Sequence, residues 1–316
     1  MDIVMLGLSG AGKTTYVAAL YYRMANGLYD YTMEYNYWNN YMYKRYVKGN
    51  YNYTLDEAVR ERAELKSVSQ NISKGLYPPP TAIKQEYVFR MTYKDMNSIK
   101  FNWFDYRGGA LMERSSQSSD SAELISKIRN SDALIVFLDG TKLEEPLSKN
   151  EREYRRLVYL IKNAISCITV ENGTFFPVSF VITKDDLCSN VLNSEGFNYF
   201  VDNILNDIAQ SKKIAALVTW VTVNKEHIYN VHWPLFFSIC HCMNKYIDEE
   251  FKSYAERKKN RGPLGSIKEF FTEEDKNRTW RIVDRLEGSK KNLASILNPT
   301  CSLYAYNSLI LKYRFF

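Results

Sequence analysis

The sequence predicts a three-layer α/β fold, in which helices cover both faces of a mostly parallel sheet with one antiparallel edge strand. Short, continuously apolar runs typical of buried strands alternate along the chain with segments whose apolar residues recur at helical spacing. Two β-prone segments, 83–93 and 99–104, flank a polar, turn-like tetrapeptide and predict an antiparallel hairpin. Alternating strands and helices are typical of a parallel sheet between helices, to which the hairpin adds its antiparallel strand.

The elements follow in order from the N-terminus. A first apolar run ends at Gly7, and from Thr14 onward apolar residues recur at helical spacing, which predicts a strand, a loop and a helix. The hairpin ends at Asp105, and a serine-rich stretch separates it from two strand–helix units, a last strand and a last helix. The expected strands are 3–6, 83–93, 99–104, 133–138, 178–182 and 215–223, and the later helices are 151–168, 197–208 and 234–250.

Two segments stand outside this alternation. Residues 26–80, approximately, form an insertion that is crowded with tyrosines and contains a helix, opened by a capping box at Thr54 and Glu57 and closed near Gly75. Residues 251–316 form a C-terminal extension that mixes charged and aromatic residues and lacks the low complexity of a disordered tail. We therefore expect one main domain over residues 1–250, with the extension packed on it.

Composition narrows the class of protein. No apolar run approaches the roughly 20 residues that a membrane span requires. The N-terminal residues lack the basic and apolar segments of a secretory signal, so we expect a cytoplasmic protein, in which five scattered cysteines remain reduced. The net charge of +6 is spread over 316 residues and does not by itself indicate a nucleic-acid partner.

The loop after the first strand carries a phosphate-binding pattern. Residues 7–14 read G-L-S-G-A-G-K-T and match G-x-x-x-x-G-K-[ST], the P-loop or Walker A pattern, between a strand and a helix as that pattern requires. Lys13 is expected to reach the β and γ phosphates, and Thr14 to offer its hydroxyl to Mg²⁺. The alternative is a glycine-rich turn with an accidental lysine and threonine. The backbone amides expected to point at the phosphates belong to Gly10, Ala11, Gly12, Lys13, Thr14 and Thr15.

A second pattern follows the hairpin. Asp105 ends a strand and Gly108 follows three residues later, as in D-x-x-G. Asp105 is expected to hold Mg²⁺ through water and the Gly108 amide to bind the γ-phosphate, so that loss of this phosphate releases the following loop. Thr81, after three prolines, is the candidate to close over Mg²⁺; the alternative is a surface threonine after a helix stop. Arg107 is a candidate internal arginine finger, although an ion-paired surface arginine is the favoured alternative.

A third pattern predicts the base. Thr183, Lys184 and Asp186 fit [NT]-K-x-D at the carboxyl end of an expected parallel strand, where open α/β sheets bind ligands. The Asp186 carboxylate can accept hydrogen bonds from guanine N1–H and the exocyclic amine, a donor pair that adenine lacks. Lys184 is expected to lie along the base plane. At the end of the next strand, residues 222–224 (Thr222, Val223 and Asn224) are candidates to touch guanine O6.

Together these residues resemble the Ras-like, translation-factor-related (TRAFAC) class of P-loop GTPases, over about residues 1–250. The segments 78–81, 105–109 and 229–237 are similar to the bacterial double-GTPase group. This resemblance implies a prokaryotic switch that is paired with a second GTPase or another effector and acts in a defence or conflict system. The chain differs from Ras-like proteins at Gly109, which stands where they carry the water-positioning glutamine, so we expect slow intrinsic hydrolysis of GTP to GDP.

The sequence is compatible with three functions. The first is a Mg²⁺-dependent GTPase switch whose insertion and extension bind a protein partner. The second is a scaffold that binds GTP and does not hydrolyse it, motivated by Gly109. The third is an ATPase or nucleic-acid motor, against which Asp186 argues. The tyrosines of residues 29–53 could stack on nucleic acid, but packing on the domain or on a protein partner is the favoured interpretation.

Overall fold

The computed structural model describes residues 1–79, 85–93, 97–106, 119–170, 175–211 and 213–259, together with 288, 291–293, 295 and 308–311. Its centre is a sheet with the strand order β2-β3-β4-β1-β5-β6-β7-β8, and β9 also pairs with β7. Strands β4, β1, β5, β6 and β7 are mutually parallel. The strands are Asp2–Gly7 (β1), Tyr31–Tyr35 (β2), Gln85–Tyr93 (β3), Asn97–Asp105 (β4), Ala133–Asp139 (β5), Phe176–Thr183 (β6), Ile214–Val223 (β7), Ile228–Tyr229 (β8) and Ser308–Leu311 (β9).

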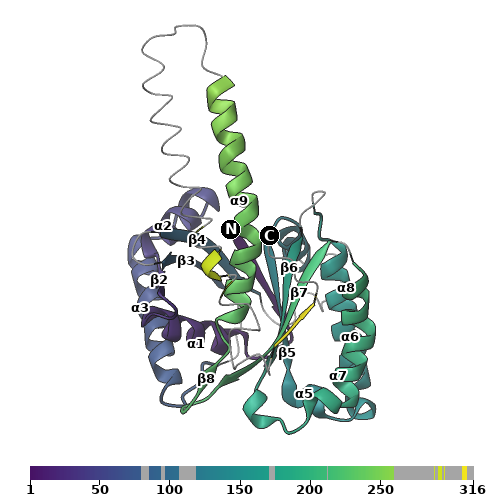
Figure 1. Ribbon diagram of the computed structural model, residues 1–316. Helices are drawn as coiled ribbons and strands as arrows, with labels where there is room; N and C mark the ends of the chain where they lie inside the picture. The colour runs from purple at the N-terminus through teal and green to yellow at the C-terminus, as the bar shows by residue number, and fades with distance from the viewer. Residues whose placement is uncertain are drawn as a thin grey trace, which may run out of the picture.

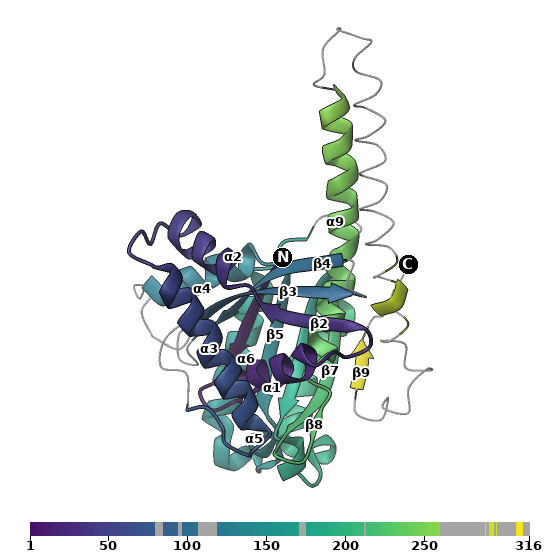
Figure 2. The ribbon, with the colours of Figure 1, turned by 90° about the vertical axis from the view of Figure 1, so that its left-hand side faces the viewer.

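Helices cover the two faces of the sheet and give three layers (Figures 1 and 2). One core cluster joins one set of sheet side chains to α1, α3 and α9, and a second joins the alternate set to α4, α6, α7 and α8. Alternation along β1 decides the division, because Ile3 and Met5 belong to the first cluster while Val4 and Leu6 belong to the second. The longer helices are Lys13–Ala25 (α1), Leu55–Ile72 (α3), Ser119–Arg129 (α4), Leu147–Ser166 (α6) and Trp233–Lys259 (α9), and the shorter ones are Glu195–Phe200 (α7) and Asn206–Gln210 (α8).

The predicted α/β class and mostly parallel sheet are confirmed, but the prediction of one antiparallel edge strand is wrong in detail. β3 is antiparallel to β4, as the hairpin predicted, yet β2 pairs beyond it and forms the edge. At the other side, β8 and β9 both pair antiparallel with β7. The missed strand β2 lies inside the tyrosine-rich insertion, where Tyr31, Met33 and Tyr35 are buried and the residues between them are exposed. This alternation with period two is the strand pattern itself.

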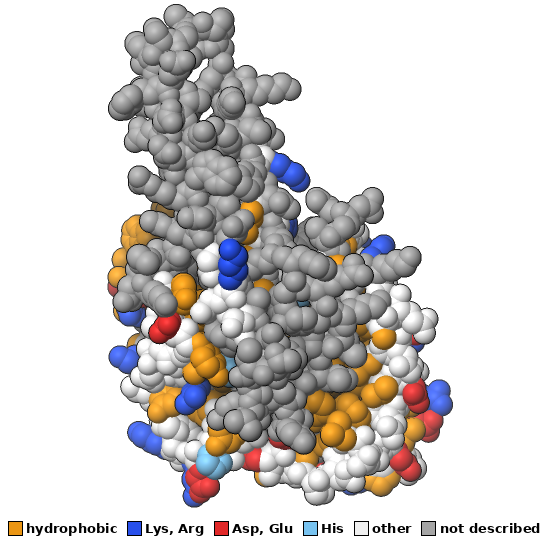
Figure 3. Space-filling view, viewed as in Figure 1, with side chains coloured by type: hydrophobic (Ala, Val, Ile, Leu, Met, Phe, Trp, Pro, Cys, Tyr) orange, Lys and Arg blue, Asp and Glu red, His pale blue; other side chains and the backbone are white. Residues whose placement is uncertain are grey.

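The last helix of the main domain runs past the predicted domain boundary. α9 was expected over 234–250 and continues to Lys259, so the boundary placed at residue 250 falls within a helix. Further along, β9 lies in the extension and pairs with β7 from Thr219↔Ser308 to Ala216↔Leu311. Among the described residues, no helix combines the length and apolar character needed to cross a bilayer. On the face shown in Figure 3, acidic and basic side chains of the described residues are interspersed.

A carboxylate network holds the insertion together. The insertion consists of β2, the short helix Tyr37–Met42 (α2), a π-helical turn Tyr43–Val47 (η1) and α3, which packs on α1. Glu61 of α3 accepts hydrogen bonds from Tyr35 and Tyr53 hydroxyls, each at 2.8 Å, and from the buried Asn40 amide at 2.8 Å. Lys44 completes the set, with Nζ 2.8 Å from a carboxylate oxygen of Glu61. Burial and the neighbouring Glu61 both raise the pKa of Tyr35 and Tyr53, which keeps these hydroxyls protonated donors.

Because four donors converge on one carboxylate, replacing Glu61 should loosen the insertion. We expect Glu61→Ala to lower the free energy of opening of α2 and α3 by about 2–3 kcal/mol, since buried hydroxyl and amide donors lose their acceptor. Hydrogen exchange of the amides in 37–72 measures this change. Glu64→Ala, an exposed position on the same helix, is the control and should shift the same quantity by less than about 0.5 kcal/mol. Equal effects of the two variants would contradict the network's role.

Candidate functional site

The loop between β1 and α1 is shaped by two glycines. Gly10 and Gly12 both have φ of +81°, a left-handed conformation that residues with a Cβ rarely adopt. Gly12 caps α1, and its carbonyl accepts the helical hydrogen bond of the Tyr16 amide at 2.8 Å. The preceding turn is closed by the Ala11 amide, which donates to the Leu8 carbonyl at 3.2 Å. Since the first amides of a helix lack partners within the helix, this loop and helix start are suited to hold an anion.

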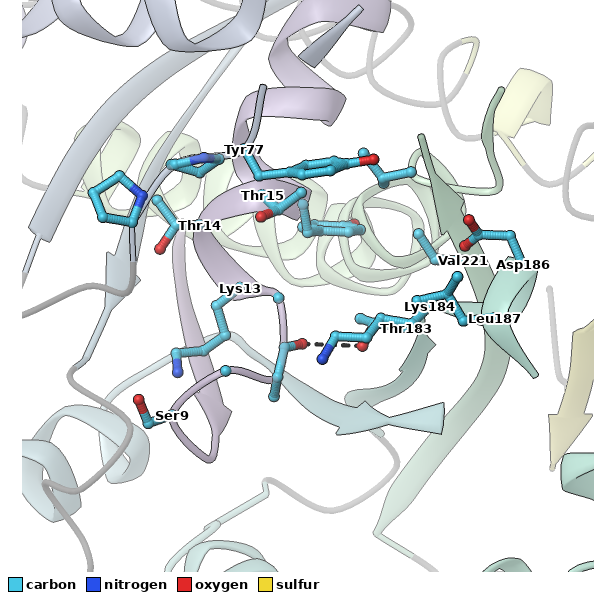
Figure 4. A pocket seen from close by; sticks show the side chains of 17 residues that line it. Ser9, Lys13, Thr14, Thr15, Tyr77, Thr183, Lys184, Asp186, Leu187 and Val221 are labelled. Atoms are coloured by element: carbon cyan, nitrogen blue, oxygen red, sulfur yellow. Dashed lines mark hydrogen bonds between the residues drawn. The ribbon is translucent and has the colours of Figure 1, made fainter. Parts of the chain in front are cut away.

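Lys13 is folded back into this loop. The residue is only 6% exposed, and its Nζ donates to the carbonyls of Gly7 at 3.0 Å and Leu8 at 3.4 Å. Burial lowers the pKa of the Lys13 ammonium, while the nearby Asp105 carboxylate acts in the opposite direction. Figure 4 shows the side chain extending toward Ser9, along the loop and beside the cavity. A buried cation thus lies at the N-terminal end of α1, the end of a helix that favours anions.

Thr14 and Asp105 meet beside this cation. β4 lies parallel to β1 with Asp105 opposite Met5, which carries the fully buried carboxylate to the start of α1. The Thr14 hydroxyl donates to Oδ2 of Asp105 at 3.3 Å. A hydroxyl and a carboxylate are the hard oxygen ligands that Mg²⁺ prefers. The donor set therefore fits Mg²⁺, which would be held by these two residues together with phosphate and water oxygens.

The Thr183–Asp186 turn, called the base-reading turn in the proposals below, contacts residues 7–15, which we call the glycine loop. The buried hydroxyl of Thr183 is 3.1 Å from the Ala11 carbonyl and 3.2 Å from the Leu138 carbonyl, so it joins the end of β6 to the loop. Lys184 has a left-handed backbone, with φ of 58°. Asp186 follows in a single 3₁₀ turn, Asp185–Leu187 (η2), and is exposed.

The end of β7 supports this turn from the other side. Val223 lines the same cavity, and Asn224 Nδ2 donates to Oδ2 of Asp186 at 3.0 Å. The side-chain oxygen of Asn224 accepts from the amides of Glu226 and His227, at 3.0 and 2.7 Å. Thr222 is buried in the strand pairing with β8. Asn224 thus contacts Asp186 from the loop after β7.

One cavity of about 450 Å³ unites the two patterns. This volume lies within the roughly 300–1,000 Å³ typical of small-ligand sites. The lining contains all six predicted residues of the glycine loop and most of the predicted base-reading residues, whereas Asp105 lies behind Thr14 and Asn224 behind Asp186. Figure 4 shows Lys13 at one end of the cavity and Asp186 at the other. The predicted lining residues are Gly10, Ala11, Gly12, Lys13, Thr14, Thr15, Thr183, Lys184, Asp186 and Val223.

The cavity also has walls that sequence reasoning missed. Tyr77, Pro78 and Pro79 line it from the end of the insertion, and Leu187 and Val221 line it from the side of the Thr183–Asp186 turn. Tyr77 is 52% exposed, and Figure 4 shows its ring across the cavity from Leu187. α3 brings this segment here by packing along α1 and ending close to the β7–β8 loop. The sequence signal was limited to an aromatic residue before a proline run.

Three predicted catalytic or sensor residues, Thr81, Arg107 and Gly108, lie outside the described residues. Asp105 is the last residue of β4, so the D-x-x-G pattern is described only at its first position and the next residue, Tyr106. No protein-family model and no curated protein sequence matches the chain.

Proposed function

We propose that the chain is a Mg²⁺-dependent, GTP-binding molecular switch of the P-loop type, which signals to a protein partner. One observation carries the proposal: the glycine loop with Lys13 and the turn with Asp186 line the same cavity. A nucleotide spanning it would place its phosphates at the amides and ammonium of one end and its base at the carboxylate of the other. Guanine offers that carboxylate two donors, and adenine does not.

Slow hydrolysis is part of the proposal. In the TRAFAC resemblance, Gly109 stands where a glutamine orients the attacking water, so this chain has no side chain for that task at that position. A partner that contributes an arginine could supply roughly 10³- to 10⁵-fold in rate. The resemblance to the bacterial double-GTPase group makes a second GTPase, or an effector in a defence system, the proposed partner. The alternative, a GTP-bound scaffold without hydrolysis, rests on the same Gly109.

Calorimetry on nucleotide-free protein with Mg²⁺ tests the central claim. We expect GTP and GDP to bind at least roughly 100-fold more tightly than ATP, because unpaired polar groups in a hydrogen-bonding site penalise the wrong base. Equal affinities for GTP and ATP would overturn the proposal. Identifying the nucleotide that remains bound after the GTP-loaded protein has been stored for days then distinguishes the two alternatives. Recovered GDP supports the switch, and intact GTP supports the scaffold.

Tyr77 gives a prediction of its own, since its ring lines the cavity opposite the base-reading turn. Aromatic stacking on a base contributes roughly 1–3 kcal/mol and depends little on which base is present. Tyr77→Ala should therefore weaken GDP binding roughly 5- to 100-fold without changing the ratio of GDP to ADP affinity. Tyr51→Ala is the matched control, because Tyr51 is an exposed tyrosine of the same insertion outside the cavity. Calorimetry measures the GDP and ADP affinities of both variants. Wild-type GDP affinity in Tyr77→Ala would exclude a contact between Tyr77 and the nucleotide.

A further inference from the structure

Asp139 holds the lysine of the base-reading turn. It ends β5, and the parallel register places it opposite Thr183 at the end of β6. Its Oδ2 lies 2.5 Å from Nζ of Lys184, an ion pair between neighbouring strand ends. The Asp139 side chain is 14% exposed, so solvent screens this pair less than it screens a fully exposed one. Sequence patterns gave Asp139 no role, since it stands 45 positions before Lys184.

The other oxygen of Asp139 fixes the direction of its carboxylate. Oδ1 accepts hydrogen bonds from the amide of Thr141 at 3.1 Å and from the Thr141 hydroxyl at 2.7 Å. Asp139 is thereby the N-cap of the short helix Gly140–Glu144 (α5). One oxygen is anchored by the helix start, and the other is directed at the ammonium of Lys184. The carboxylate is therefore pre-oriented before any ligand binds.

Lys184 needs such support. Its φ of 58° and ψ of 33° lie in the left-handed region, which is uncommon for residues other than glycine and costs energy unless the surroundings hold it. Lys184 lines the large cavity, whereas Asp139 does not. With its ammonium bound to Asp139, the aliphatic stem of Lys184 is kept at the cavity wall where a base would lie. Asp139 can thus act on a bound base only through Lys184.

We infer that Asp139 is a positioning residue for base recognition, which orients Lys184 along the plane of a guanine base. The inference rests on the proposed nucleotide site and adds to it a second carboxylate, one that never touches the ligand. Its purely structural alternative is the capping of α5. The two roles are separable, because asparagine caps helices as well as aspartate but carries no charge for Lys184.

The test uses the full-length chain and Asp139→Asn. We expect its affinity for GDP to fall roughly 10-fold, as a charge-assisted hydrogen bond is lost, while the cap and the thermal unfolding temperature are retained. Affinity for Mg²⁺-tripolyphosphate, which reports on the glycine loop alone, should stay within about twofold. Glu145→Gln is the matched control, because this carboxylate forms an ion pair with Lys149 at 3.3 Å away from the base-reading turn. It should bind GDP like the wild type.

A double-mutant cycle completes the test. If Asp139 acts through Lys184, adding Asp139→Asn to Lys184→Ala should leave the GDP affinity of the single Lys184→Ala variant unchanged within about twofold. Three results would overturn the inference. Asp139→Asn could bind GDP like the wild type, or it could lower GDP affinity by the full amount even in the Lys184→Ala background. It could also lower affinity for tripolyphosphate as much as affinity for GDP. Failure of the wild type to prefer GDP to ADP would instead overturn the proposed function itself, so the two failures are distinguishable.

Discussion

Replacing Lys13 by methionine should weaken binding of Mg²⁺-GTP by at least roughly 100-fold. The ammonium is buried among the carbonyls of Gly7 and Leu8 at the start of α1, so it adds a full positive charge to a site otherwise formed by amide dipoles. Charge-assisted bonds to phosphate inside a protein contribute about 1.5–3 kcal/mol each, and one ammonium can make more than one of them. Methionine keeps most of the stem and removes the charge.

Calorimetry with GTP measures this loss, and circular dichroism on heating confirms that the variant folds. The control is Lys149→Met, which removes an exposed lysine that pairs with Glu145. It should leave GTP affinity within about twofold, since surface ion pairs contribute little. If Lys13→Met binds GTP as tightly as the wild type, Lys13 does not contact the phosphates and the glycine loop holds something else.

The sign of the Lys13 pKa shift adds a pH dependence. Burial lowers the pKa of Lys13 in the folded chain, so the unfolded chain keeps this proton to higher pH than the folded one. The free energy of unfolding contributed by Lys13 therefore rises as pH increases from the folded pKa toward the unfolded one. A bound phosphate would favour the charged ammonium and raise the folded pKa again. GTP affinity should accordingly fall as pH rises through the alkaline range, and less so in Lys13→Met.

Asp186→Asn should reverse the choice of base from guanine to xanthine. The aspartate can accept from guanine N1–H and the exocyclic amine, whereas asparagine can accept from N1–H and donate to the xanthine oxygen that replaces that amine. We expect GTP affinity to fall roughly 100-fold or more and XTP to become the preferred ligand. The hydrogen bond from Asn224 can be kept, because the new amide retains one oxygen.

Competition between GTP and XTP for the same protein measures this change directly. Asp185→Asn is the matched control: Asp185 is the adjacent carboxylate, it does not line the cavity, and its pKa is raised by burial and by Asp186. This control should retain the wild-type preference for GTP. Unchanged selectivity in Asp186→Asn would remove the base assignment, and with it the argument for guanine over adenine.

Local patterns predicted the parts of the site that depend on local geometry. The glycine loop, Lys13 and the turn with Asp186 each lie within a few residues of chain, and strand-end topology was sufficient to expect them at one edge of the sheet. Tyr77 was missed because its place depends on how α3 packs along α1. Asp139 was missed because its partner is defined by β5 lying next to β6. Such tertiary neighbours leave no fixed spacing in the sequence.

The insertion illustrates the same limit for the fold. Tyr31, Met33 and Tyr35 alternate with exposed residues over only five positions, within a tyrosine-rich stretch that was expected to be an insertion outside the strand–helix alternation. Their partner strand begins at residue 85, and the register pairs Tyr31 with Tyr93. A short strand with a distant partner is a weak local signal, because pairing rather than propensity determines it. The helix α3 was easier, since its Thr54–Glu57 capping box is present as predicted.

The position of β1 has a consequence for synthesis of the chain. β1 is synthesised before its partners β4 and β5, yet it lies between them in the sheet, and its pairing with β5 extends to Phe137. Until that residue has emerged, β1 has at least one open side with unsatisfied backbone groups. Contacts between residues far apart in the sequence, such as the pairing of Gly7 with Phe137, slow folding. A nascent chain halted between β4 and β5 should therefore be prone to aggregate, whereas a chain that already contains β5 can pair both sides of β1.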